Sequence, residues 1–254
     1  MNRRLLIAAI IFSLFFSCRT ISETTSYEYN NMSISIVSDS LSDEKYEEIL
    51  APYRIQIQEK MNEVIGYSTE GLVSYRPESP LSNLLSDMIL DFGVQYCNTY
   101  SIDASPEISL FNHGGIRASL PEGDVKVLNA YQIMPFENEI VLLQLTGEQV
   151  ISLANYITTR GGEGVSGISF GMLDGKASNI KIQGSIIDLN RKYWLVTSDY
   201  IANGGDGMRV LTWADQRIDT GYLIRDVLIA TFRDMHEQNK PIHSVNDGRI
   251  YYVE

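Results

Sequence analysis

Residues 108–117, Ile-Ser-Leu-Phe-Asn-His-Gly-Gly-Ile-Arg, decide how this chain is interpreted. The apolar run at 108–111 predicts a buried strand, and the next residues turn directly off its end. Gly114 and Gly115 allow a tight turn whose backbone amides face an anion, while Arg117 and Asn112 can donate hydrogen bonds to phosphate oxygens. A glycine pair after a strand is also an ordinary turn. This segment alone therefore leaves both an anion site and a plain turn open.

A second glycine segment, residues 198–207, reads Ser-Asp-Tyr-Ile-Ala-Asn-Gly-Gly-Asp-Gly and also follows a strand-like run. Tyr200 offers an aromatic face, and the turn around Gly204 and Gly205 presents the Asp206 carboxylate. Aromatic faces bind flat bases, and a neighbouring carboxylate can accept both hydroxyls of a ribose. The alternative is a hairpin loop in which Asp206 only forms the turn.

A third segment, residues 134–138, reads Met-Pro-Phe-Glu-Asn and precedes a strand-like run. Pro135 fixes the backbone there and projects Phe136. A phenylalanine in this position is either a binding surface or a side chain that fills the core.

The rest of the chain mixes helices and strands. We expect a helix over 42–65, a second from Pro80 with Ser79 as its cap, a third from Thr146 with Gln149 in a capping box, and a fourth over about 220–235. The strand-like runs lie at residues 32–37, 108–111, 140–145, 180–183, 185–189, 194–198 and 250–253. Their irregular spacing argues against a repeating βαβ array. We therefore predict an α+β fold, a single domain with a mixed β-sheet covered by helices.

The amino-acid composition limits the size of the domain and the kinds of partner that the chain can bind. The 254 residues, 44% of them apolar, are enough for one large domain or two small ones with a sizeable core. The chain has 20 basic and 32 acidic residues, which gives it a net charge of -12. A negative charge of this size repels a polyphosphate backbone. Nucleic acid is therefore not expected as a partner.

The N-terminus predicts export. Two arginines, Arg3 and Arg4, precede a run at 5–16 that is apolar apart from Ser13. Such a run rises only about 18 Å as a helix, short of the roughly 30 Å needed to cross a membrane.

Cys18 follows this run after one small residue, Ser17, an arrangement that resembles a bacterial lipoprotein signal peptide over 1–18. Lipidation of Cys18 would anchor the protein to a membrane of the cell envelope, facing the periplasm. Ordinary cleavage near Ser17 is the alternative. Residues 19–40 are then a tether and first strand, and 41–254 form the domain. Cys97 remains as a single thiol, expected in the core.

The three segments together are more specific than each alone. In this order and spacing they resemble the motifs of the C-terminal, substrate-binding domain of the 5'-nucleotidase and UDP-sugar hydrolase family. Residues 76–89, Arg-Pro-Glu-Ser-Pro-Leu-Ser-Asn-Leu-Leu-Ser-Asp-Met-Ile, share this resemblance, which covers about 41–215. It implies that domain's fold, with 42–65 as the interdomain connector helix.

The resemblance also implies a role for each motif residue. Phe136 and Tyr200 would stack on opposite faces of the nucleobase, and Asp206 would accept the ribose hydroxyls. The phosphate would be reached by Asn112, Arg117 and Arg76. Tyr200 stands where phenylalanine is frequent, and His113 replaces a commoner glycine.

Enzymes of this family hydrolyse the phosphate ester at a two-metal site in an N-terminal domain. The histidines of this chain, His113, His236 and His243, are scattered and form no Asp-x-His or Gly-His-x-His cluster. We therefore expect no catalytic residue, cofactor or metal in this chain, with divalent metals in a separate exported metallophosphoesterase.

Two functions stay open on this basis. In the first, the chain binds a nucleoside monophosphate or nucleotide sugar and positions it for hydrolysis by that partner in nucleotide catabolism, with the connector helix as docking element. In the second, it is a lipid-anchored nucleotide-binding or scavenging module without a catalytic partner.

Overall fold

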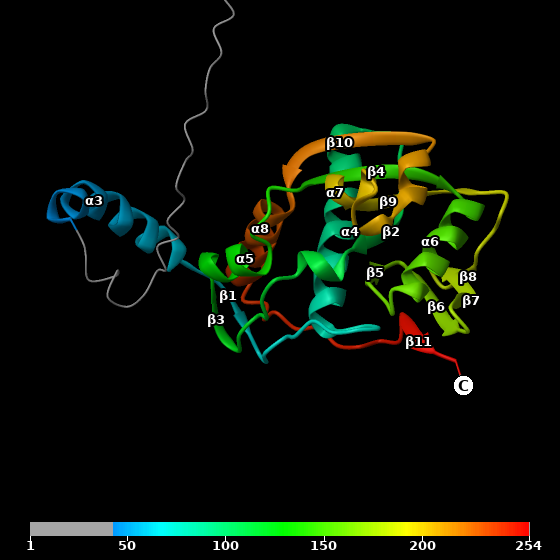
Figure 1. Ribbon diagram of the computed structural model, residues 1–254, viewed down its shortest axis with the longest axis horizontal. Helices are drawn as coiled ribbons and strands as arrows, with labels where there is room; N and C mark the ends of the chain where they lie inside the picture. Colours follow the sequence, from blue (N-terminus) through cyan, green and yellow to red (C-terminus); the bar gives the residue numbers. More distant parts are fainter. Residues whose placement is uncertain (1–42, 254) are drawn as a thin grey trace, which may run out of the picture. The chain divides into compact units, whose positions relative to one another are not determined.

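The computed structural model describes residues 43–253 (Figure 1). The predicted signal peptide, the predicted tether and the strand predicted over 32–37 lie outside these residues. The first helix of the described part, α3 (Glu44–Met61), contains Pro52 and buries none of its residues. The helix predicted over 42–65 was too long at its C-terminal end, because Val64 begins strand β1 (Val64–Ser68), which pairs with β3 (Gly123–Lys126).

The centre of the fold is a five-stranded sheet in the order β10-β4-β9-β2-β5. Its strands are β2 (Pro106–Phe111), β4 (Glu139–Thr146), β5 (Gly164–Ser166), β9 (Lys192–Ser198) and β10 (Gln216–Leu223). Strands β2 and β9 run parallel, whereas the other neighbours are antiparallel. The prediction of a mixed sheet is confirmed.

Strand β10 corrects the predicted start of the fourth helix. The helix expected over 220–235 begins later, as α8 (Ile224–Glu237), because the chain before it pairs with β4 as far as Leu223 opposite Glu139. Thr220 donates its hydroxyl hydrogen to the Ile140 carbonyl at 2.7 Å. Sheet pairing thus takes residues that local patterning assigned to the helix.

Both faces of the sheet are buried. Along β4, Ile140 and Leu142 join a cluster formed with α4 (Pro80–Tyr100), α5 (Val127–Ile133) and α8. The alternate residues Val141, Leu143 and Leu145 join a second cluster, formed with α6 (Gly147–Thr159) and a second sheet. Successive side chains of a strand point to opposite faces, so one apolar strand serves two layers.

The second sheet has the order β11-β6-β7-β8 and consists of β6 (Ile168–Leu173), β7 (Lys176–Ile182), β8 (Ser185–Ile186) and β11 (Ile250–Tyr252). It lies beside α6 (Figure 1). Strand β8 is shorter than the run predicted over 185–189. The predicted α+β class, helices covering a mixed sheet, is observed.

Two of the predicted helix starts, at Ser79 and Thr146, are confirmed. Ser79 caps α4, although its capping-box partner is the Ser82 hydroxyl, and Thr146 caps α6 with Gln149 completing the box. Cys97 lies in the core, as expected.

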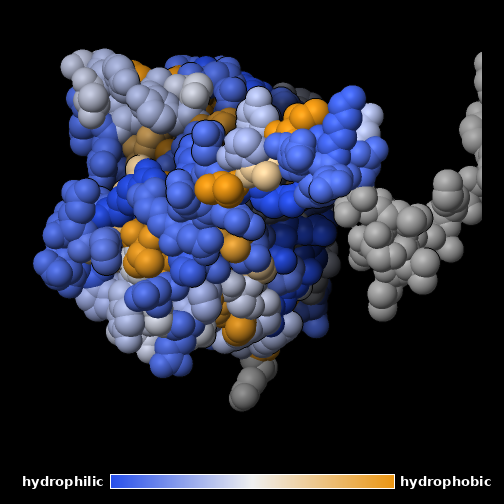
Figure 2. Space-filling view, turned by 90° about the vertical axis from the view of Figure 1, so that its left-hand side faces the viewer, coloured by the Kyte–Doolittle hydropathy of each residue, from blue (hydrophilic) through white to orange (hydrophobic). Residues whose placement is uncertain are grey.

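The surface is mostly polar on the face seen in Figure 2, where apolar residues form small separate patches. Among the helices of residues 43–253, none is long and apolar enough to cross a bilayer.

Candidate functional site

A pocket of about 380 Å³ is formed by side chains from all three glycine and aromatic segments. Its lining consists of Asn112, Gly114, Gly115, Arg117, Met134, Phe136, Asn138, Tyr200 and Asp206. Five of the six side chains predicted to bind substrate are therefore brought together, and Arg76 is the exception.

Sheet topology explains this meeting. Strands β2 and β9 are parallel neighbours, so the segments that follow them leave the same edge of the sheet. Strand β4 is antiparallel to β9, with Ile140 opposite Ser198, so the segment before β4 reaches that edge as well. The C-terminal edge of parallel strands is a common place for ligand sites.

The Asp206 carboxylate lies at the centre of a hydrogen-bond network. One oxygen, Oδ2, accepts a hydrogen bond from Asn112 Nδ2 at 2.9 Å and forms an ion pair with Arg160 at 3.3 Å. The other, Oδ1, accepts from the Tyr200 hydroxyl at 3.1 Å. The backbone carbonyl accepts from the Tyr156 hydroxyl at 3.0 Å, while the residue adopts a left-handed conformation with φ of 52°. This carboxylate is held in one orientation.

In the turns after β2 and β9, neighbouring side chains lie so close to the backbone that the positions require glycine. A Cβ atom at Gly205 would lie 2.6 Å from Tyr200 Cε1, and one at Gly115 would lie 2.9 Å from Asn112 Oδ1. Gly204 has a φ of 87°, which favours glycine. Side chains at these positions would displace the groups that line the pocket.

Arg117 is exposed and forms no ion pair within residues 43–253. Its guanidinium lies 5.9 Å from the centre of the Phe136 ring and donates a long hydrogen bond of 3.4 Å to the Gly114 carbonyl. A positive charge without an acidic partner, beside an aromatic face, is suited to an anionic group of a ligand that also carries an aromatic ring.

The two aromatic rings are accessible to a ligand. Phe136 is 41% exposed and Tyr200 is 46% exposed, so neither is a core side chain. The interpretation of Phe136 as a residue that fills the core is wrong. That the rings hold a base from opposite sides stays a prediction.

Arg76 lies outside the pocket lining. Its Nε donates to the Gly162 carbonyl at 2.8 Å, and its NH2 group pairs with Glu163 Oε1 at 2.9 Å. The same carboxylate, whose side chain is 0% exposed, accepts from Arg160 Nε at 2.6 Å and from the His113 backbone amide. The predicted contact between Arg76 and phosphate stays a prediction, but its charge already faces a buried carboxylate.

Sequence reasoning missed Arg160, Glu163 and Tyr156. The only local signal is a further glycine pair, Gly161 and Gly162, between two charged residues at the end of α6. In space these residues link the turn after β2 to the turn after β9. Glu163 accepts a hydrogen bond from the His113 amide in the first turn, and Arg160 donates both to Glu163 and to the Asp206 carbonyl in the second.

The surroundings of His113 disfavour the charged form of its imidazole. Burial lowers the pKa of the imidazole, the charge of Arg76 lowers it further, and Glu163 opposes the shift. Its Nδ1 lies 2.9 Å from the Ser74 hydroxyl, within hydrogen-bond distance.

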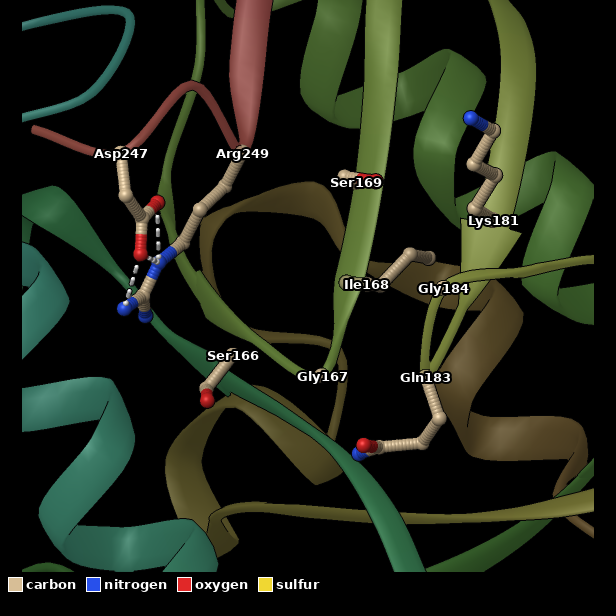
Figure 3. Close-up of a pocket in the computed structure, with 9 residues that line it drawn as sticks. All are labelled: Ser166, Gly167, Ile168, Ser169, Lys181, Gln183, Gly184, Asp247 and Arg249. Carbon is tan, nitrogen blue, oxygen red and sulfur yellow. Dashed lines mark hydrogen bonds and ion pairs between the residues drawn. The ribbon is translucent and has the colours of Figure 1, made fainter.

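A second hollow of about 260 Å³ lies between β6 and the segment before β11. There the Arg249 guanidinium is paired with Asp247, as Figure 3 shows, and also with Asp87. Unlike the first pocket, this hollow has no aromatic side chain in its lining.

Residues 64–213 match the model of the 5'-nucleotidase C-terminal domain. The chain belongs to this family. The three segments that line the pocket, and the Arg160–Glu163 segment that supports them, all lie within the matched 5'-nucleotidase C-terminal domain.

The similar proteins are longer than this chain. A 5'-nucleotidase of Vibrio vulnificus is 28% identical over 228 residues, which cover 86% of this chain and 39% of that protein. Protein UshA of Escherichia coli is 30% identical over 129 residues, covering 49% of this chain and 24% of that protein. The chain thus spans about two-fifths or less of these relatives.

Solved structures agree on the fold. The 5'-nucleotidase precursor of Thermus thermophilus superposes with a TM-score of 0.68 at 28% identity, covering 82% of this chain and 43% of that one. The NAD nucleotidase of Haemophilus influenzae, at 18% identity and a TM-score of 0.61, shares the fold.

Within residues 43–253, no three histidine, cysteine or acidic side chains are grouped so that they could hold a metal ion.

Proposed function

We propose that the pocket binds the nucleoside part of a nucleoside monophosphate or nucleotide sugar. The observation that carries this proposal is the convergence of two exposed aromatic rings, one oriented carboxylate and one unpaired guanidinium on a single pocket. Each group meets a different part of a nucleotide. Phe136 and Tyr200 face the base, Asp206 the ribose, and Arg117 with Asn112 the phosphate.

Replacing Phe136 with Ala tests the base contact. We expect a loss of about 1–3 kcal/mol in binding free energy for adenosine and AMP alike, the range for one base stacked on an aromatic ring. Calorimetric titration of the purified chain measures both. Because Phe136 is half-exposed, its removal should leave the thermal unfolding temperature nearly unchanged, and Leu128→Ala, a 39% exposed residue outside the pocket, is the matched control. Unchanged binding in a folded Phe136→Ala variant would exclude this pocket as the base site.

We further propose that hydrolysis in nucleotide catabolism is supplied in trans by an exported metallophosphoesterase, which carries the divalent metals. Two facts support it: the matched domain is the C-terminal one, and relatives named 5'-nucleotidase extend well beyond the aligned part. Helix α3 offers exposed apolar side chains for docking, among them Tyr46, Tyr53 and Ile57. The second candidate is a nucleotide-scavenging module with the same pocket and no partner.

The purified chain is expected to release no phosphate from AMP with Mn²⁺, Zn²⁺ or Co²⁺, because the donors that such ions need are not grouped among residues 43–253. Phosphate release is measured with and without an added exported metallophosphoesterase of about 300 residues, a size within the range of single domains. Release that depends on both proteins favours the partner model over scavenging. Metal-dependent turnover that persists in the chain alone, through successive purification steps, would contradict it.

We also propose that the protein is exported and anchored through a lipid on Cys18. Support comes from the position of this cysteine at the end of the N-terminal apolar run. Cys18→Ala should release the protein from membranes or leave the precursor unprocessed, as fractionation and immunoblotting would show. Cys97→Ala, which removes the other thiol of the chain, is the matched control. Membrane attachment that survives Cys18→Ala would show that another element anchors the protein.

A further inference from the structure

Arg225 is a buried arginine without an acidic partner. The residue is 7% exposed and forms no ion pair within residues 43–253. Its Nε is buried and has no hydrogen-bond partner among the described residues. Arg225 also stands in the first turn of α8, where the positive end of the helix dipole disfavours a cation. Neither its burial nor its place in the helix favours an arginine, which directs attention to what the guanidinium contacts.

The guanidinium contacts α5 and the segment that follows this helix. Its Cζ atom lies 4.2 Å from the centre of the Tyr131 ring, and Nη1 donates a long hydrogen bond of 3.4 Å to the Phe136 carbonyl. The preceding residue makes a second link, because the Ile224 amide donates to the Asn138 carbonyl at 2.9 Å. The first turn of α8 therefore holds the segment 136–138 at two of its carbonyl groups.

Phe136 depends on such contacts for its position. It stands between the end of α5 at Ile133 and the start of β4 at Glu139, in a stretch without regular secondary structure. The residue is 41% exposed, so packing in the core holds its ring only in part. A hydrogen bond to its own carbonyl limits where this ring can lie.

We propose that Arg225 is a positioning residue for the base-binding ring, which it holds through the Phe136 carbonyl. This inference rests on the proposed function, in which Phe136 contacts the nucleobase. Arg225 does not line the pocket, so it acts through Phe136 and not on the ligand. A ring that is held in place before the ligand arrives loses less conformational freedom on binding, which raises affinity.

Arg225→Met tests the proposal, because it removes the hydrogen-bond donors and keeps a long, unbranched side chain. In calorimetric titration of the full chain, the Kd for adenosine should rise about threefold to tenfold, the effect of losing one hydrogen bond. The Kd for AMP should rise by the same factor, because both ligands share the base contact. Thermal unfolding confirms that the variant is folded.

The double variant Arg225→Met, Phe136→Ala separates a positioning role from a general effect on the fold. If Arg225 acts through the ring, its replacement should not lower adenosine affinity further once the ring is gone, so the two losses are not additive. Should Arg225→Met not fold, Arg225→Lys enters the same comparison, because lysine keeps the charge and loses the planar fork of donors.

Arg233→Met is the matched control on the same helix. Arg233 is 42% exposed and pairs with Glu63 at 2.8 Å, outside the pocket lining. Its replacement removes one arginine charge from α8 and should leave the affinity for adenosine at the wild-type value.

Four results would overturn the inference. Unchanged adenosine affinity in a folded Arg225→Met variant shows that the residue has no such role, while the pocket itself stands. A loss of equal size with and without the Phe136 ring shows that Arg225 acts on the fold at large. A loss for AMP alone shows that its charge acts on the phosphate. If the wild type binds neither ligand, the proposed function fails, and the inference fails with it.

Discussion

Replacing Glu163 with Ala is expected to lower the free energy of unfolding by about 3–5 kcal/mol, the range for removing one partner of a buried ion pair. Its side chain is 0% exposed and faces two arginines, Arg76 at 2.9 Å and Arg160 at 2.6 Å. Without the carboxylate, Arg76 loses its acidic partner and Arg160 keeps only its ion pair with Asp206, both in a partly buried place. The His113 amide loses its acceptor as well.

The same substitution should weaken nucleotide binding, since the carboxylate holds both glycine turns. The backbone after β2 is tied to Glu163 through His113, and Arg160 joins this carboxylate to Asp206. Freed from Glu163, the two turns would have to be ordered by the ligand, at the expense of affinity.

Urea denaturation measures the stability change, and Glu107→Ala is the matched control. Glu107 also pairs with an arginine, Arg191, at 3.0 Å, but the side chains are 21% and 55% exposed. An ion pair on the surface contributes about 0–1 kcal/mol. Equal stability losses in the two variants would show that burial of Glu163 has no special weight.

Arg117→Ala is expected to lower the affinity for AMP by about 1.5–3 kcal/mol, the range for hydrogen bonds to charged groups, and to leave adenosine binding nearly unchanged. The reason is electrostatic. Arg117 is exposed and has no acidic partner within the described part of the chain, so its charge is available to a phosphate. Titration with adenosine and AMP separates the phosphate contact from the base contact.

Two further arginine variants make this result specific. Arg209→Ala removes an exposed arginine of the helix η3 (Arg209–Trp213), outside the pocket lining, and controls for the loss of net charge. Arg76→Ala tests the role that the family resemblance implies. Because Arg76 is paired with Glu163, we expect it to change stability more than the ratio of AMP to adenosine affinity. If Arg117→Ala lowers both affinities equally, the guanidinium acts on the pocket as a whole and does not meet the phosphate.

Much of the fold was predictable from local patterns. The caps at Ser79 and Thr146 marked two helix starts, because their signals lie within four residues. The strand before Asn112 was visible as an apolar run. Local patterns failed where pairing decides: residues 220–223 belong to β10, and strands β1, β3 and β5 were not predicted, because their stability comes from partners distant in sequence.

For the site, the sequence alone identified five side chains that line the pocket, Phe136, Tyr200, Asp206, Asn112 and Arg117, since these stand in short segments whose residue types and order are specific. Tertiary structure alone decided how they are held. Glu163, fifty positions from His113, meets its backbone amide, and Arg160 meets Asp206 only because α6 ends beside the turn after β9. The Tyr200 hydroxyl on the Asp206 carboxylate belongs to the same class of facts. Hydrogen bonds and buried ion pairs depend on positions in space to within a few tenths of an ångström, which spacing along the chain does not specify.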